Sequence, residues 1–130
     1  MIIIDTSVWI LIINRVNHPK AEAGRALIQQ TGEIAIPGMV LDEILRGFRS
    51  DKQFDVMKRY LIEDFEYLEM TRDIFIKSAE IYRKLRQNGI TLKNPADCLI
   101  ASCAIENKVA VIENDSDFQK IAMIFPLDLL

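Results

Sequence analysis

Four acidic residues occupy positions where a globular protein more often places other residue types. Asp5 directly follows three isoleucines, and Asp97 lies in a segment, residues 96–105, that is apolar almost all round. Glu43 lies off the apolar stripe of its predicted helix, and Asp115 follows a short β-branched run. Because three of the four lie at strand-to-helix junctions or in first helical turns, we expect them to converge at one end of a sheet.

Carboxylates gathered in this way repel one another, and a bound divalent cation removes that cost. Mg²⁺ and Mn²⁺ prefer oxygen ligands and retain several waters. Sites of this kind act on phosphate substrates, where the cation positions water and stabilises charge on the phosphoryl group. The four carboxylates therefore predict a metal-dependent reaction on a phosphate ester, with Mg²⁺ or Mn²⁺ as the cofactor.

Each carboxylate also has an ordinary structural interpretation. Asp5 could cap a helix that begins at Thr6. Glu43 could be a solvated helix residue paired with Arg46, an interaction worth a few tenths of a kcal/mol. Asp97 would be favoured in a first helical turn by the helix dipole, although burying its charge is costly unless something pairs with it.

The segment Asn114-Asp115-Ser116-Asp117-Phe118 contains two aspartates in front of a predicted helix. One of them is expected to cap that helix, and capping does not require both. We choose Asp115 as the metal ligand and keep Asp117 as a possible one.

The elements that must position these residues alternate along the chain. The predicted strands are 2–4, 33–36, 65–70 and 109–112, with a possible last strand over 124–129. The predicted helices are 6–13, 19–30, 39–48, 51–62, 71–87, 95–107 and 115–122. Strands separated by helices imply crossover connections, so we expect one three-layer α/β/α domain over residues 1–130, with a mostly parallel sheet of four or five strands.

Several helix ends have local signals. Thr71 is a predicted N-cap, and Asn88-Gly89 is a predicted stop. Asn94 is expected to cap a helix that starts at Pro95, and Gly32 follows the end of the helix 19–30. Two aromatic residues, Trp9 and Phe48, are expected in the core.

Composition limits the class of protein. The chain has 130 residues, and half of them are hydrophobic, so a core without disulfide or metal staples is feasible. The net charge of −3 is unlike the basic balance common in nucleic-acid binders, but 16 Lys and Arg residues are available for a local patch. The start of the chain lacks the pattern of a signal peptide, and no apolar run reaches the ~20 residues of a membrane span. We expect no contact with a membrane and a cytoplasmic location.

The cysteine and histidine content excludes other chemistries. Cys98 and Cys103 would lie on different faces of a helix, so we expect two unpaired buried thiols in a reducing compartment. His18 is the one histidine in the sequence, which excludes a ribonuclease built on a histidine pair and leaves too few soft ligands for zinc.

Four segments in this order resemble the PIN domain family, and more narrowly its VapC toxin branch, over nearly the whole chain. They are residues 2–7 (IIIDTS), 41–47 (LDEILRG), 94–101 (NPADCLIA) and 114–118 (NDSDF). The resemblance implies a PIN-like fold with Asp5, Glu43, Asp97 and Asp115 as catalytic metal ligands. It also implies an endoribonuclease that cuts single-stranded or looped RNA, in toxin members usually transfer or ribosomal RNA. Such toxins are inhibited by a cognate antitoxin that covers the active groove, and family members are often homodimers.

Glu113 departs from the family pattern, because the position two before the fourth aspartate is often threonine or another small or neutral polar residue. Glu113 could add a metal ligand or could face solvent. Thr6 and Ser7 could orient a ligand or contact phosphate, and Thr6 could equally be an N-cap.

RNA requires cations along its path. Arg46 and Arg49 lie near Glu43 in sequence, and Lys93 precedes the segment of Asp97, so these three are candidate phosphate contacts. The alternative for each is ordinary surface charge.

Two other functions fit parts of the pattern. A receiver-like signalling module is also a small α/β domain with an acidic pocket, but it needs paired acids after the first strand and an aspartate after a central one. A non-catalytic PIN-like domain that binds RNA or protein would keep the fold without the reaction. Nucleotide binding through a glycine-rich phosphate loop is not supported, because the sequence contains no such loop.

Overall fold

The structure is a computed structural model of the chain and describes residues 1–31 and 33–130. The strands are β1 (Ile2–Ile4), β2 (Ile34–Pro37), β3 (Glu66–Leu68) and β4 (Ala110–Ile112). The helices are α1 (Thr6–Ile13), α2 (Pro19–Thr31), α3 (Gly38–Leu45), α4 (Asp51–Asp64), α5 (Arg72–Gln87), α6 (Ala96–Asn107) and α7 (Ser116–Ala122).

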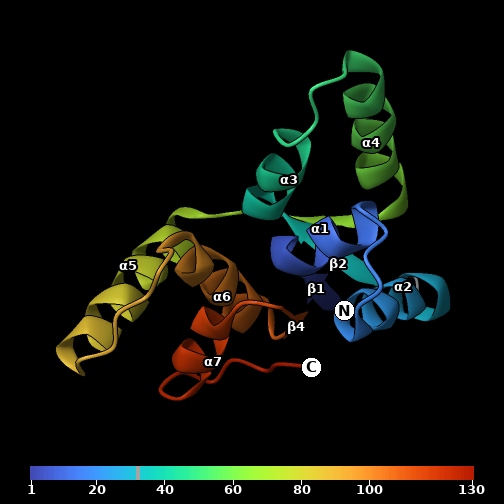
Figure 1. Cartoon of the computed structure of the whole chain (residues 1–130). Coiled ribbons are helices and arrows are strands. Elements are labelled where there is room, and N and C mark those ends of the chain that lie inside the picture. Colours follow the sequence, from blue (N-terminus) through green and yellow to red (C-terminus); the bar gives the residue numbers. More distant parts are fainter. Residues whose placement is uncertain (32) are drawn as a thin grey trace.

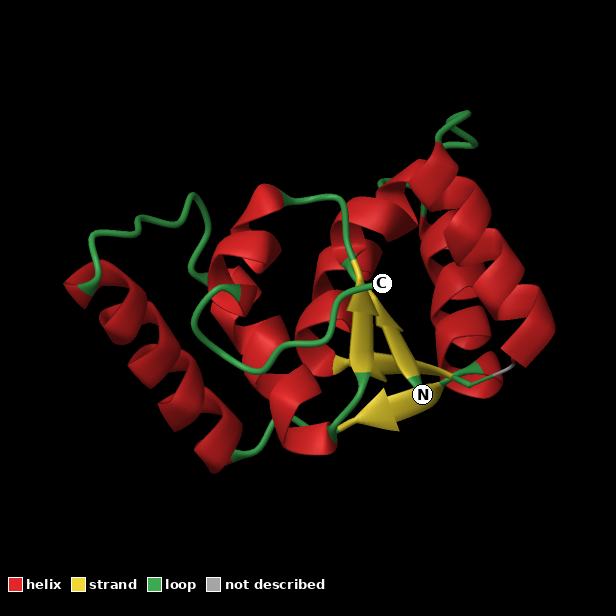
Figure 2. Cartoon of the chain, turned by 90° about the horizontal axis from the view of Figure 1, so that it is seen from below, coloured by secondary structure: helices red, strands yellow, loops and turns green. Residues whose placement is uncertain are grey.

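The four strands form one parallel sheet in the order β3-β2-β1-β4. The chain moves outward from β1 to β3 and then returns to add β4 on the other side of β1. The groups α1–α2 and α5–α7 lie on opposite sides of the sheet, which gives the expected three layers (Figures 1 and 2). The reversal of direction places a topological switch point between β1 and β4, where open parallel sheets usually bind ligands beyond the carboxyl ends of the strands.

The core surrounds the two central strands. Ile3 and Ile4 in β1 are fully buried, as are Ala35 in β2 and Val111 in β4. These short apolar runs are typical of strands that are covered on both faces. Helix α6 packs against α3, α5, α7 and β4 and is buried along most of its length, which confirms the prediction from its all-round apolar sequence.

Most predicted helix ends agree with the structure. The Thr71 hydroxyl accepts a hydrogen bond from the Ile74 N–H at 3.4 Å, and Gly89 adopts the positive φ of +74° that stops α5. The side chain of Asn94 accepts from the Ala96 N–H at 3.1 Å, although α6 begins one residue later than predicted. The predicted stop at Gly32 lies outside the described residues.

Two elements differ from the prediction. The helix expected to reach Phe48 ends at Leu45, because the next turn tightens: the N–H groups of Gly47 and Phe48 donate to carbonyls three residues back. The last strand, expected over 124–129, is wrong. The N–H groups of Ile124 and Phe125 donate back to Ile121, which prolongs the end of α7.

Pro126 has no N–H to donate to a neighbouring strand, so strand pairing can begin only after this residue. What remains is a single parallel bridge between Val111 and Leu129, so the sheet has four strands among the described residues.

Both cysteines, Cys98 and Cys103, are buried and unpaired, as predicted. Within residues 1–31 and 33–130, none of the helices combines the length and apolar character needed to cross a membrane.

The core packing of α5 can be tested at Leu85, which is fully buried. We expect Leu85→Ala to lower the free energy of unfolding by about 2–5 kcal/mol, because it removes buried surface and leaves a cavity. Ile76→Ala, on the same helix but 51% exposed, should change it by less than about 1 kcal/mol. Urea unfolding followed by circular dichroism measures both, and equal losses would contradict this packing.

Candidate metal centre

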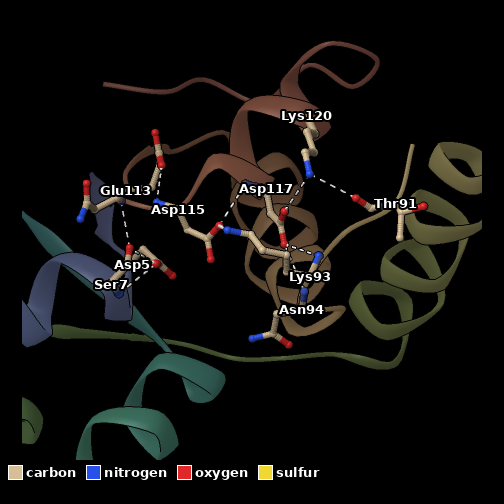
Figure 3. A network of polar contacts seen from close by, with 10 residues as sticks. Asp5, Ser7, Thr91, Lys93, Asn94, Glu113, Asp115, Asp117 and Lys120 are labelled. Carbon is tan, nitrogen blue, oxygen red and sulfur yellow. Dashed lines mark hydrogen bonds and ion pairs between the residues drawn. The ribbon is translucent and has the colours of Figure 1, made fainter. Parts of the chain in front are cut away.

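The site begins where β1 ends. Asp5 is buried and caps α1, because its side chain accepts hydrogen bonds from the backbone N–H of Ser7 at 3.0 Å and from the Ser7 hydroxyl. The Ser7 oxygen in turn accepts from the Asn114 N–H at 2.9 Å, which ties the start of α1 to the segment after β4 (Figure 3). Asp5 therefore caps a helix and also stands at the switch point. The alternative in which Thr6 caps this helix is wrong, since Thr6 is its first residue.

Glu43 comes from α3 and is held by two contacts. The Thr6 hydroxyl donates to Oε1 at 3.1 Å, and the Arg46 guanidinium lies 3.8 Å from Oε2. The predicted pair with Arg46 is thus present, and Thr6 also orients the carboxylate. Burial is the main cause that raises the pKa of Glu43, and repulsion from Asp5 adds to it.

Asp97 lies in the first turn of α6 and is only 6% exposed. Its Oδ2 atom is buried and has no hydrogen-bond partner among the described residues. Burial first, and then repulsion from Asp5 and Asp115, raises the pKa of Asp97 to about 8. A buried carboxylate oxygen without a partner is unfavourable in the isolated protein, and a cation would supply the missing interaction.

Asp115 and Asp117 have different surroundings. Asp115 caps α7: its Oδ1 accepts from the Asp117 N–H at 3.0 Å and lies 3.8 Å from the ammonium of Lys93. Asp117 is fully buried, and its Oδ2 accepts from the backbone N–H groups of Lys93 and Asn94 at 2.8 and 3.1 Å.

The second oxygen of Asp117 lies 3.5 Å from the ammonium of Lys120 (Figure 3). Asp117 therefore holds the segment that leads into α6, and its oxygens are largely occupied by the protein itself. One carboxylate oxygen each from Asp97, Asp115 and Asp117 still lies within 4.8 Å of the others.

Glu113 is buried rather than facing solvent. Its Oε2 accepts from the Asp115 N–H at 2.8 Å, so it fixes the backbone at which Asp115 leaves β4 (Figure 3). Of its two predicted roles, the solvent-facing one is wrong.

The donor set fits a hard divalent cation. Charge repulsion links Asp97 to both Asp5 and Asp115, and it links Asp5 to Glu43, so the four predicted carboxylates act on one another. All of them offer oxygen, which Mg²⁺ and Mn²⁺ prefer. The unpartnered Oδ2 of Asp97 is the observation that a cation would explain.

The three candidate phosphate contacts all lie at the edge of this cluster. Arg46 contacts Asp42 at 3.3 Å as well as Glu43, and Lys93 stands beside Asp115. Arg49 lines a cavity together with Glu43. The sequence did not indicate this cavity, because its walls come from separate parts of α1, α3 and α4 and no local pattern joins them.

Fold and site together define a small parallel α/β domain with an acidic pocket at its switch point. The sequence profile described as "PIN domain" matches residues 2–123. The chain therefore belongs to the PIN domain family.

Comparison with individual proteins indicates which branch of the family the chain resembles. Two curated relatives, VapC ribonuclease Mb1587 of Mycobacterium bovis and ribonuclease VapC11 of Mycobacterium tuberculosis, are each 34% identical over 126 residues, covering 95% of this chain and 93% of the relative. Among solved structures, VapBC2 from Rickettsia felis, bound to a DNA fragment from its promoter, superposes with a TM-score of 0.77 at 24% identity. The match covers 100% of this chain and 98% of that one. The likeness lies in the VapC branch of the family, as the sequence resemblance indicated.

The raised pKa of Asp97 predicts how the stability of the metal-free protein depends on pH. A carboxyl whose pKa rises on folding, here from 3.8 to about 8, contributes stability that is complete below its unfolded value. That contribution is lost as the pH rises through about 8. We therefore expect the free energy of unfolding in EDTA to fall more steeply with pH in the wild type than in Asp97→Asn. Urea unfolding at several pH values between about 5 and 9 measures the two slopes, and parallel profiles would contradict the burial described here.

Proposed function

We propose that this protein is a metal-dependent endoribonuclease that cleaves single-stranded or looped RNA and serves as the toxin of a type II toxin–antitoxin pair. The observation that carries the proposal is the buried, unpartnered carboxylate oxygen of Asp97, close to Asp5 and Asp115 at the switch point. Two relatives at 34% identity over almost the whole chain are named as ribonucleases, which supports the reaction class.

Asp5, Asp97 and Asp115 would hold the cation, with Glu43 as a further ligand or acting through a water. When bound, Mg²⁺ or Mn²⁺ activates water and stabilises the charge that develops on the phosphate. The reaction is an in-line hydrolysis, in which a water oxygen bonds to phosphorus and the bond from phosphorus to the leaving oxygen breaks.

The other residues position these groups. Ser7 fixes Asp5, Thr6 fixes Glu43, and the Glu113 carboxylate fixes the backbone of Asp115. Asp117 acts on the loop before α6, so we assign it a positioning function and leave Asp115 as the ligand.

Cations at the edge of the site would bind the RNA backbone. In this structure the ammonium of Lys93 is the partner of Asp115. If Asp115 holds a divalent cation, the Lys93 ammonium would be free to bind a phosphate oxygen instead. Arg46 has the same relation to Glu43, and Arg49 lies nearby at the cavity.

The two alternative functions have less support. A receiver-like module requires paired acids after its first strand and a further aspartate after a central strand. Here β1 is followed by Asp5 alone, and β2, the other central strand, is followed by Gly38 and Met39. A non-catalytic binding domain would not need the oxygen of Asp97 to stay buried without a partner.

A protein partner follows from the family. The structural relatives include VapBC2 from Rickettsia felis and a toxin–antitoxin complex from Klebsiella pneumoniae. We propose that an antitoxin of this kind binds our protein and covers its acidic groove. A single PIN-like domain over residues 1–130, a homodimer and a cytoplasmic location, all expected from the sequence, complete the proposal.

Cleavage of a pool of structured RNAs tests the reaction. We expect the wild type to cut with Mg²⁺ or Mn²⁺ and to stop in excess EDTA, and we expect Asp5→Asn and Asp97→Asn to abolish cutting. Asp42→Asn is the matched control, because Asp42 adjoins Glu43 in sequence but is exposed and pairs with Arg46. Metal-independent cutting, or full activity in Asp97→Asn, would disprove the proposed site.

The partner can be tested by co-expression with a small open reading frame that neighbours the gene. We expect growth arrest from the wild type alone, rescue by the neighbour, and co-purification of the two proteins. Asp97→Asn should remove the toxicity while leaving co-purification intact. Toxicity that persists in this variant would mean that growth arrest does not come from RNA cleavage.

A further inference from the structure

A cavity of about 480 Å³ opens next to the acidic cluster, between α1, α3 and the start of α4. Its volume lies within the roughly 300–1,000 Å³ of small-molecule sites. The apolar side chains of the wall are Ile10, Ile13, Ile44 and Phe48. Phe48 was expected in the core, and it does pack against the core, but it also faces this cavity.

Three polar side chains in the wall are available to a ligand. Asn14, Arg49 and Gln53 line the cavity, and all three are exposed. In the part of the chain that the structure describes, their side chains make no hydrogen bond or ion pair. Two amides and a guanidinium therefore face the space with free donors, and the amides also offer acceptors.

One residue belongs to both the cavity and the acidic cluster. Glu43 lines the cavity, and its carboxylate also accepts from Thr6 and feels the charge of Asp5. A group in the cavity would therefore lie beside whatever phosphate is held at the carboxylates.

We propose that this cavity binds the base of the RNA nucleotide next to the cleaved phosphate. The inference rests on the proposed function, since it names part of the substrate of that site. A nucleobase has an apolar face, which suits Phe48 and the three isoleucines, and a polar edge, which suits the amides of Asn14 and Gln53. Arg49 supplies positive charge for the backbone that enters with the base.

A second cavity in the same molecule lacks the features that suit a nucleobase. Its volume is about 310 Å³, and Ile36, Leu41, Leu61, Ile62 and Tyr67 line it. It contains no amide, no charged side chain and none of the predicted site residues. It therefore serves as the internal control in both experiments below.

The first experiment measures binding without cleavage. Isoleucine methyl groups are observed by NMR in EDTA while a mixture of single-stranded RNA hexamers is added. We expect the signals of Ile10, Ile13 and Ile44, which all line the cavity, to shift, and that of Ile62 to stay unchanged. Absence of these shifts, or an equal shift at Ile62, would overturn the proposal.

The second experiment reads sequence preference. The wild type, Ile10→Trp and Gln53→Ala cut a randomised RNA pool, and the new ends are sequenced. We expect both variants to weaken the preference at one position flanking the cut, with about a tenfold loss of kcat/KM on the preferred sequence for Ile10→Trp, because the indole fills the space of the base. Ile62→Trp, an exposed isoleucine at the other cavity, should keep the wild-type preference.

The outcomes separate this proposal from the proposed function. Methyl shifts with RNA but no cutting by the wild type would support the base site and disprove the nuclease. Cutting with an unchanged preference in Ile10→Trp would overturn the base site and leave the nuclease intact. An unchanged preference is also expected if the cavity binds a side chain of the antitoxin instead of a base. In that case Ile10→Trp should bind the antitoxin more weakly, which would identify that occupant.

Discussion

The repulsion among buried carboxylates is the constraint around which the rest of this structure is arranged. Asp97 and Asp5 are almost fully buried and act on each other electrostatically, and Asp115 adds a third carboxyl group. Burial and repulsion both disfavour the charged forms, so the isolated protein must hold them in place by other means. It does so with ordinary local devices: Asp5 and Asp115 each cap a helix, and Asp97 sits in the first turn of a third. Each acid thereby gains part of its stabilisation from a helix N-terminus.

Sheet topology explains why these helix starts meet. In a parallel sheet every connecting helix begins near the carboxyl ends of the strands, so residues at that boundary share one edge. The strand order β3-β2-β1-β4 then puts the ends of β1 and β4 side by side, and the Ser7 oxygen links them through Asn114. Asp117 then connects the start of α7 to α6, since its carboxylate binds the backbone just before α6. A site with residues more than 90 positions apart is thus fixed by a few short polar contacts.

These same features decide how far the sequence could predict the molecule. Strong local signals, such as the isoleucine run before Asp5, the Thr71 cap and the all-round apolar α6, predicted elements that the structure confirms. The predicted last strand failed because residues 124 and 125 instead prolong the turn at the end of α7, with Pro126 directly after it, and such a turn has no periodic signature. The cavity at Ile10 was not foreseeable, since its walls come together only through the packing of three helices.

Asp5 and Asp115 each serve as a helix cap and as a candidate metal ligand, which explains why neither could be assigned one function from the sequence. A helix cap and a metal ligand require the same atom types at the same place, so no local pattern distinguishes Asp5 as cap from Asp5 as ligand. The two functions differ in whether the carboxylate keeps an oxygen that no group of the protein binds. Asp117 has both oxygens occupied by the protein, whereas Asp97 keeps one buried oxygen without a partner among the described residues. The protein retains that unfavourable group at the point where β1 and β4 end, and a bound cation there would turn it into a favourable one.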